Sequence, residues 1–205
     1  MMHVTVYTWQ ADTDLPPGRQ AHTALRVWGD LILEVVANER NLAVEPSVTI
    51  RRDAIFALLG TDIPAATRAP SGAHLIELTV DAERSAVARL DLADPLFFPT
   101  TWRRFHQWLV DGHGYDPAYI EEEFLPTSAP LTRMKPSAAP ELLAYTDPRL
   151  LELLVEFFSP LALPYLQSWG PLSEVTSGGH DDLEVIVPPG AINASELDQT
   201  REDPR

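Results

Sequence analysis

The chain contains no cysteine, and only one of its 15 basic residues, Lys135, is a lysine. The first absence excludes disulfides, thiolate nucleophiles and cysteine-ligated zinc or iron–sulfur sites. The second excludes Walker-type and Schiff-base lysines, because Lys135 lies in a proline-rich segment. The glycine-rich phosphate loops, the nucleophile elbow and the zincin motif are missing as well. Histidine, carboxylate and hydroxyl chemistry remain, and no cofactor is expected.

Positive charge is scarcest in the C-terminal quarter. The 205 residues include 30 Asp and Glu against 15 Lys and Arg, for a net charge of -15. Between Arg149 and Arg201 there is no Lys or Arg, whereas eight acids occur: Glu152, Glu156, Glu174, Asp181, Asp182, Glu184, Glu196 and Asp198. Such a region should project a negative potential that repels nucleic acid and anionic membranes. A basic or neutral protein is the better partner.

The composition also bears on location. The first residues carry neither the basic nor the apolar segment of a signal peptide, so the chain is expected in the cytoplasm. The most apolar stretch, residues 150 to 166, contains two glutamates and two prolines and is predicted to be core rather than a membrane span. The excess of arginine over lysine favours a GC-rich bacterial source.

Alternating apolar residues predict short strands in the N-terminal half. One strand is expected at residues 4 to 9, and a hairpin is expected to join 23–28 to 31–36 across Gly29-Asp30. A second hairpin should pair 74–80 with 85–92 across residues 81 to 83, with one face of the sheet covered and the other wet. Between the hairpins, Ile55, Leu58 and Leu59 share a helical face, which predicts a helix over residues 50 to 59.

Helical periodicity replaces alternation after residue 95. Trp102, Phe105, Trp108 and Leu109 form a stripe that Gly112 should end. Two Asp-Pro pairs, at residues 116–117 and 147–148, predict the starts of helices over 118–125 and 149–158, the second bent or ended by Pro160.

These elements predict an α+β fold. A small antiparallel sheet is built from hairpins in the N-terminal half, with Leu183 to Val187 as a last strand that could join it, and a layer of C-terminal helices covers the sheet. Residues 1–190 should form a single domain, and residues 191–205 an acidic, disordered tail.

Two groups of residues could hold a metal ion. His180 and the carboxylates of Asp181 and Asp182 follow two glycines just before the last strand, so this loop could bind a divalent cation or provide a general base. His106, His113, Asp116 and the glutamates at 121–123 are the other group. Their spacing favours a structural interpretation, because consecutive helical residues point about 100° apart. A metal-dependent hydrolase using His113 or His180 is the alternative function.

Two arginine pairs, at residues 51–52 and 103–104, raise the question of nucleic-acid binding. The aromatic residues near the second pair lie on the opposite helical face and should pack inward, and the arginines should pair with nearby acids. Direct nucleic-acid binding is therefore disfavoured, although an acidic chain could also mimic a nucleic acid.

The leading hypothesis is a non-enzymatic, acidic interaction protein that binds and neutralises a basic protein, as inhibitors and immunity-type proteins do. The steering charges would be Glu121, Glu122, Glu123, Asp181, Asp182 and Glu184, with Tyr165 or Trp169 as aromatic anchors.

Overall fold

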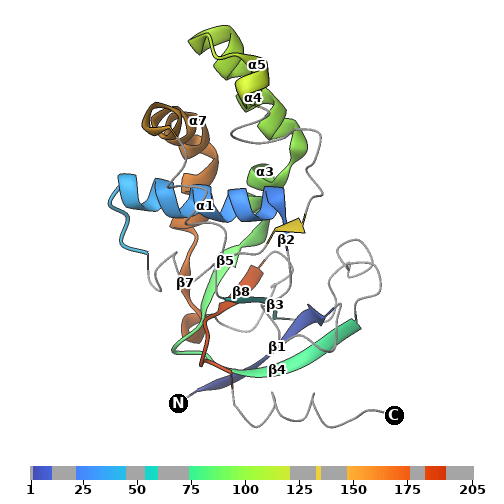
Figure 1. Ribbon diagram of the computed structural model, residues 1–205. Coiled ribbons are helices and arrows are strands. Elements are labelled where there is room, and N and C mark those ends of the chain that lie inside the picture. Colours follow the sequence, from blue (N-terminus) through green and yellow to red (C-terminus); the bar gives the residue numbers. More distant parts are fainter. Residues whose placement is uncertain are drawn as a thin grey trace. The chain divides into compact units, whose positions relative to one another are not determined.

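The computed structural model describes residues 2–10, 22–44, 54–59, 74–120, 133–134, 147–175 and 183–192. The chain divides into two compact units. The first, here called the sheet unit, comprises Met1–Gln20, Ala43–Asp91 and Gln167–Arg205; the second, the helical unit, comprises Ala21–Leu42 and Leu92–Leu166. The α+β prediction is confirmed (Figure 1).

An antiparallel six-stranded sheet forms the sheet unit, in the order β4-β1-β3-β8-β5-β7. Its strands are β1 (His3–Gln10), β3 (Ile55–Leu58), β4 (His74–Asp81), β5 (Ala86–Arg89), β7 (Gly170–Pro171) and β8 (Leu183–Val187). A short 3-10 helix, η4 (Leu172–Glu174), follows β7. The predicted strands at 4–9 and 183–187 are confirmed, and the second of these lies inside the sheet between β3 and β5.

The predicted hairpins are wrong. Residues 74–81 and 86–89 are strands, but β4 pairs with β1, whereas β5 pairs with β8 and β7. The second strand is also shorter than expected, because helix α3 begins at Leu90. The predicted helix at 50–59 is wrong too: its described part contains β3, a run of apolar residues that fits a strand with neighbours on both sides.

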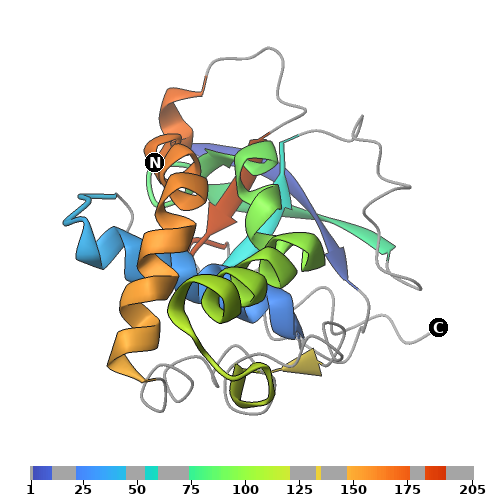
Figure 2. The ribbon, with the colours of Figure 1, turned by 90° about the horizontal axis from the view of Figure 1, so that it is seen from above.

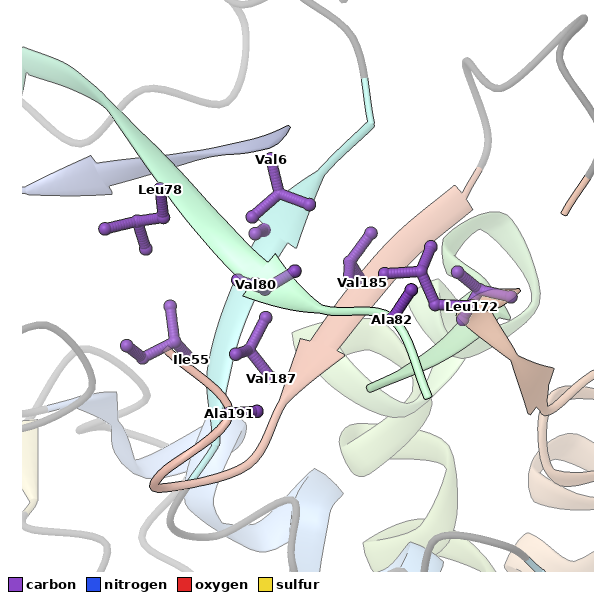
Figure 3. Packing of buried hydrophobic residues seen from close by; sticks show 11 residues of the cluster. Val6, Ile55, Leu78, Val80, Ala82, Leu172, Val185, Val187 and Ala191 are labelled. Atoms are coloured by element: carbon purple, nitrogen blue, oxygen red, sulfur yellow. The ribbon is translucent and has the colours of Figure 1, made fainter. Parts of the chain in front are cut away.

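The core of the sheet unit lies on one face of the sheet. Val6, Leu78 and Val80 of β1 and β4 gather there with Ile55, Val185 and Val187 of β3 and β8 (Figure 3). The expectation of one wet face fails at β8, where Val185, Ile186 and Val187 are all fully buried although they alternate in direction. Beyond the predicted domain boundary at residue 190, Ala191 is buried and Ile192 forms a bridge to Val80.

The helical unit holds α1 (Ala24–Glu39), α3 (Leu90–Phe97, of which the first two residues belong to the sheet unit), α4 (Pro99–His113), α5 (Pro117–Tyr119) and α7 (Pro148–Gln167, of which the last residue belongs to the sheet unit). Strands β2 (His22–Thr23) and β6 (Arg133–Met134) pair with each other in this unit. Helix α1 replaces the predicted hairpin at 23–36, because Trp28, Ile32 and Val36 recur at a spacing of four and are all buried.

Aromatic rings from three helices form the core of the helical unit. The Trp102 ring lies 6.1 Å from that of Trp28 and 4.8 Å from that of Phe158, measured between centroids. The Phe105 ring contacts those of Phe157 and Phe158 at 5.1 and 5.2 Å. These contacts place α4, green in Figure 2, beside α7, drawn in orange. The predicted aromatic stripe of α4 therefore packs inward as expected.

Helix α7 begins where the sequence predicts, and Asp147 caps it by accepting a hydrogen bond from the Arg149 N–H at 2.9 Å. It does not end at Pro160 but continues through Pro160 and Pro164 to Gln167. By length and composition this helix could cross a membrane, with a mean hydropathy of 1.2 over its most apolar window. Its apolar residues Leu150, Leu154 and Phe158 are buried, as the core prediction requires.

Candidate interaction surface

A short turn connects α4 to α5, and two residues, Gly114 and Asp116, determine its backbone conformation. Gly114 adopts a positive φ of 69°, and its N–H bonds to the carbonyl of Val110. Gly112, which the sequence suggested as the stop, is still helical. Asp116 then caps α5 by accepting a hydrogen bond from the Ala118 N–H at 2.8 Å, as the Asp-Pro pair predicts. The C-cap at Gly114 and the N-cap at Asp116 together set the direction of the chain between residues 114 and 120.

Two tyrosines stack on each other at this turn. Tyr115 and Tyr119 are four residues apart, their ring centroids are 6.3 Å apart, and their planes differ by 25°. The Tyr119 side chain is 40% exposed, whereas Ile120 beside it is buried and anchors the turn. The turn therefore presents an aromatic surface on a backbone held by helix caps. We call Tyr115, Asp116, Tyr119 and Asp147 the tyrosine corner.

Carboxylates lie in and near the tyrosine corner. Burial raises the pKa of the Tyr115 phenol above its ordinary value of 10.0; the charge of Asp147 raises it further, Arg149 opposes this effect, and Tyr119 adds to it. Asp147 is thus close enough to act on the phenol while it caps α7. Asp111 and Asp116 are exposed near the same end of α4. The exposed Arg149 lies 3.6 Å from the carboxylate of Glu152, so part of its charge is balanced.

Of the six predicted steering charges, only Glu184 lies within the described residues. Glu121, Glu122 and Glu123 lie outside the described residues, but they follow Ile120 directly in the chain and so adjoin the tyrosine corner in sequence. Glu184 is only 2% exposed on β8 of the sheet unit. Glu152 and Glu156 are exposed on α7 of the helical unit, whereas the exposed Glu174 belongs to the sheet unit. Of the described acids of the cation-free stretch, Glu184 is therefore buried, and the three exposed ones belong to two different units.

The predicted aromatic anchors are not exposed anchors in this structure. Tyr165 is fully buried in the helical unit, so it contributes to the core and not to a surface. Trp169 is half-buried in the sheet unit. The sequence analysis did not select Tyr115 and Tyr119 as contact residues. Their spacing of four residues, on either side of the predicted helix start at Asp116, could have indicated that the two rings stack.

The metal-site predictions meet no support in the described part of the chain. Within residues 2–10, 22–44, 54–59, 74–120, 133–134, 147–175 and 183–192, no group of three His, Asp or Glu side chains could hold a metal ion. His180, Asp181 and Asp182 lie outside these ranges. His106 is nearly buried beside the Phe105 ring, and His113 packs against the Trp108 ring at 4.2 Å, which fits the structural interpretation of both histidines.

The predictions for the two arginine pairs are tested only for Arg103 and Arg104. Arg51 and Arg52 lie outside the described residues. Arg103 and Arg104 are exposed on α4, opposite the buried Trp102 and Phe105, as amphipathicity predicts. The expected pairing with acids is absent: among the described residues, neither guanidinium takes part in an ion pair or a side-chain hydrogen bond.

No protein-family model, curated protein or solved structure matches this chain.

Proposed function

We propose that this chain is a non-enzymatic, acidic interaction module that binds and neutralises a basic protein, in the manner of an inhibitor or immunity-type protein, through the tyrosine corner. The observation that supports it best is the exposed Tyr119, stacked on the half-buried Tyr115 beside carboxylates that helix capping holds in place. The net charge of -15 supports it at longer range.

Charge and aromatic surface would have separate roles in binding. The net negative charge attracts a basic protein over distances of about 10 Å at 0.1 M salt and so speeds the encounter. The tyrosines would then provide the contact, because tyrosine buries a large rigid surface at low entropic cost and its ring attracts cations. The corner is preorganised by Gly114 and Asp116, so little additional ordering is needed on binding.

A short oligoarginine peptide labelled with a fluorophore can test this proposal by fluorescence anisotropy. We expect its affinity for the chain to fall as salt rises, mostly through a slower association rate. Asp116→Asn removes one charge but keeps an N-cap residue, whereas Glu174→Gln removes one exposed charge from the sheet unit. We expect the first variant to bind more weakly and the second to bind like the original chain.

Tyr119→Ala tests the aromatic contact, and we expect it to lower the affinity by about tenfold, the effect of losing one contact of hot-spot strength. Circular dichroism confirms that each variant is folded. Equal losses for Asp116→Asn and Glu174→Gln would show that only total charge matters. An unchanged affinity for Tyr119→Ala would contradict binding at the tyrosine corner.

A further inference from the structure

The solvent face of α4 carries opposite charges at its two ends. Thr100, Arg103, Arg104, Gln107 and Asp111 are all exposed, and successive members of this set lie one, three or four residues apart, so they form one stripe along the helix. The two arginines stand toward the start of α4 and Asp111 toward its end. We call these five residues the α4 stripe.

The two arginines are unusual in a chain with twice as many acids as bases. Neither guanidinium has an ion-pair partner among the described residues, although the acid Asp111 lies on the same helical face. Asp111 is too far along α4 to reach them, because eight residues of helix span about 12 Å. It instead accepts a hydrogen bond from Gln107 at 2.7 Å, which leaves its other carboxylate oxygen without a contact that the structure shows.

A second copy of the same stripe, running in the opposite direction, satisfies both ends at once. Gln107 lies midway between Arg103 and Asp111, so a two-fold axis through Gln107 places Arg103 of one copy opposite Asp111 of the other, twice over. Such a self-complementary contact closes as a dimer. We infer that the α4 stripe is a self-association surface, on which two copies pair their α4 helices antiparallel about Gln107.

The two Arg–Asp pairs would form the contact between the copies. This inference goes beyond the proposed function, and it needs no other protein.

The absence of cysteine allows a direct test of the geometry in the full chain. A disulfide needs two Cα atoms within about 7 Å, a condition met near a two-fold axis and hardly elsewhere on the interface. We expect Gln107→Cys to form a disulfide-linked dimer under mild oxidation by glutathione at least about tenfold faster than Glu152→Cys, an exposed position on α7 away from the axis. Equal rates for the two variants would overturn the inference.

Charge reversal tests the pairing. In sedimentation equilibrium at about 0.15 M salt, we expect R103E/R104E and D111R each to lower the self-association constant by about tenfold. A mixture of the two variants should associate again, because each Glu of one copy then faces an Arg of the other. A chain that stays monomeric throughout, a dimer that neither variant weakens, or a mixture that stays apart would each overturn the inference. The oligoarginine assay is independent of these outcomes, so either proposal can fail alone.

Discussion

The ring of Phe97 lies directly against the backbone of Gly29. A β-carbon added to this glycine would stand 2.6 Å from Cδ1 of Phe97 and closer still to Cε1, well inside van der Waals contact. Gly29 is itself buried in the middle of α1, and Phe97 ends α3. Glycine is therefore required at residue 29 by the close approach of the two helices, and not by a turn.

Gly29→Ala is expected to destabilise the chain by about 1–3 kcal/mol, the usual cost of overpacking a closed core. The gain in helix propensity from glycine to alanine, at most about 1 kcal/mol, opposes this cost but does not cancel it. Urea unfolding followed by circular dichroism measures the difference. The variant Gly29→Ala/Phe97→Ala should recover part of the effect, since the clash is removed. A stabilised Gly29→Ala would show that the two helices are not packed this way.

The same glycine explains why the first hairpin was predicted wrongly. Gly29-Asp30 between two apolar runs has the local signature of a tight turn, and the alternative helical spacing of Trp28, Ile32 and Val36 gives an equally good pattern. The choice between them depends on which side chains are buried, and Trp28 is buried against Trp102, which is distant in the sequence. Helix starts were predicted better, at Asp116 and Asp147, because a cap is a local hydrogen bond between residues two apart. Strand pairing could not be predicted, because β1, β3 and β8 meet through long connections.

Substitution by alanine should change the stability of the chain in opposite directions at Gly112 and Gly114. Gly112 is helical, and an added β-carbon would meet Trp108 only at an ordinary 3.9 Å, so Gly112→Ala should stabilise the chain by about 0.5–1 kcal/mol. Gly114 has a φ of 69°, where alanine is strained, so Gly114→Ala should destabilise it by about 1–2 kcal/mol. Thermal unfolding of the two variants checks the difference in sign. Two shifts in the same direction would contradict the position of the helix end.

Two buried hydroxyls of the sheet unit offer a second contrast. The Ser85 hydroxyl is buried and has no hydrogen-bond partner among the described residues, whereas the Thr8 hydroxyl donates to the Phe56 carbonyl at 2.7 Å. Ser85→Ala should leave stability unchanged or raise it by up to about 1 kcal/mol, because an unsatisfied polar group is removed. Thr8→Val keeps the shape but loses a hydrogen bond, and should cost about 1 kcal/mol. Denaturant titrations of both variants test this, and a costly Ser85→Ala would indicate a hydrogen-bond partner for this hydroxyl.

The candidate site was the part of the molecule that sequence reasoning located least well. Exposure decides which acids and aromatics can contact a partner, and exposure depends on packing across the chain. Glu184 is one of the predicted steering charges, yet it is buried on β8, which has a strand on each side. Tyr165 follows Pro160, which suggested a bend or the end of the helix, yet α7 continues and buries it. The tyrosine corner instead depends on a helix end and a cap that are both local.

The pKa of Tyr115 leads to a pH dependence of stability with a definite sign. Burial first, and the charge of Asp147 second, raise the pKa of its phenol above 10.0 in the folded chain. The unfolded chain therefore releases this proton at lower pH than the folded chain does. The resulting stability is fully present below pH 10.0 and is lost as the pH rises through the folded-state pKa. Tyr115→Phe should lose stability less steeply in this alkaline window, as measured by denaturant titrations above and below it.

Asp147→Asn keeps the α7 cap while removing the charge, so it should lower the Tyr115 pKa toward its ordinary value in a spectrophotometric titration of the phenolate. Because desolvation is the larger cause, the pKa should remain raised in that variant; a complete return to the ordinary value would show that Asp147, and not burial, dominates the environment of the tyrosine corner.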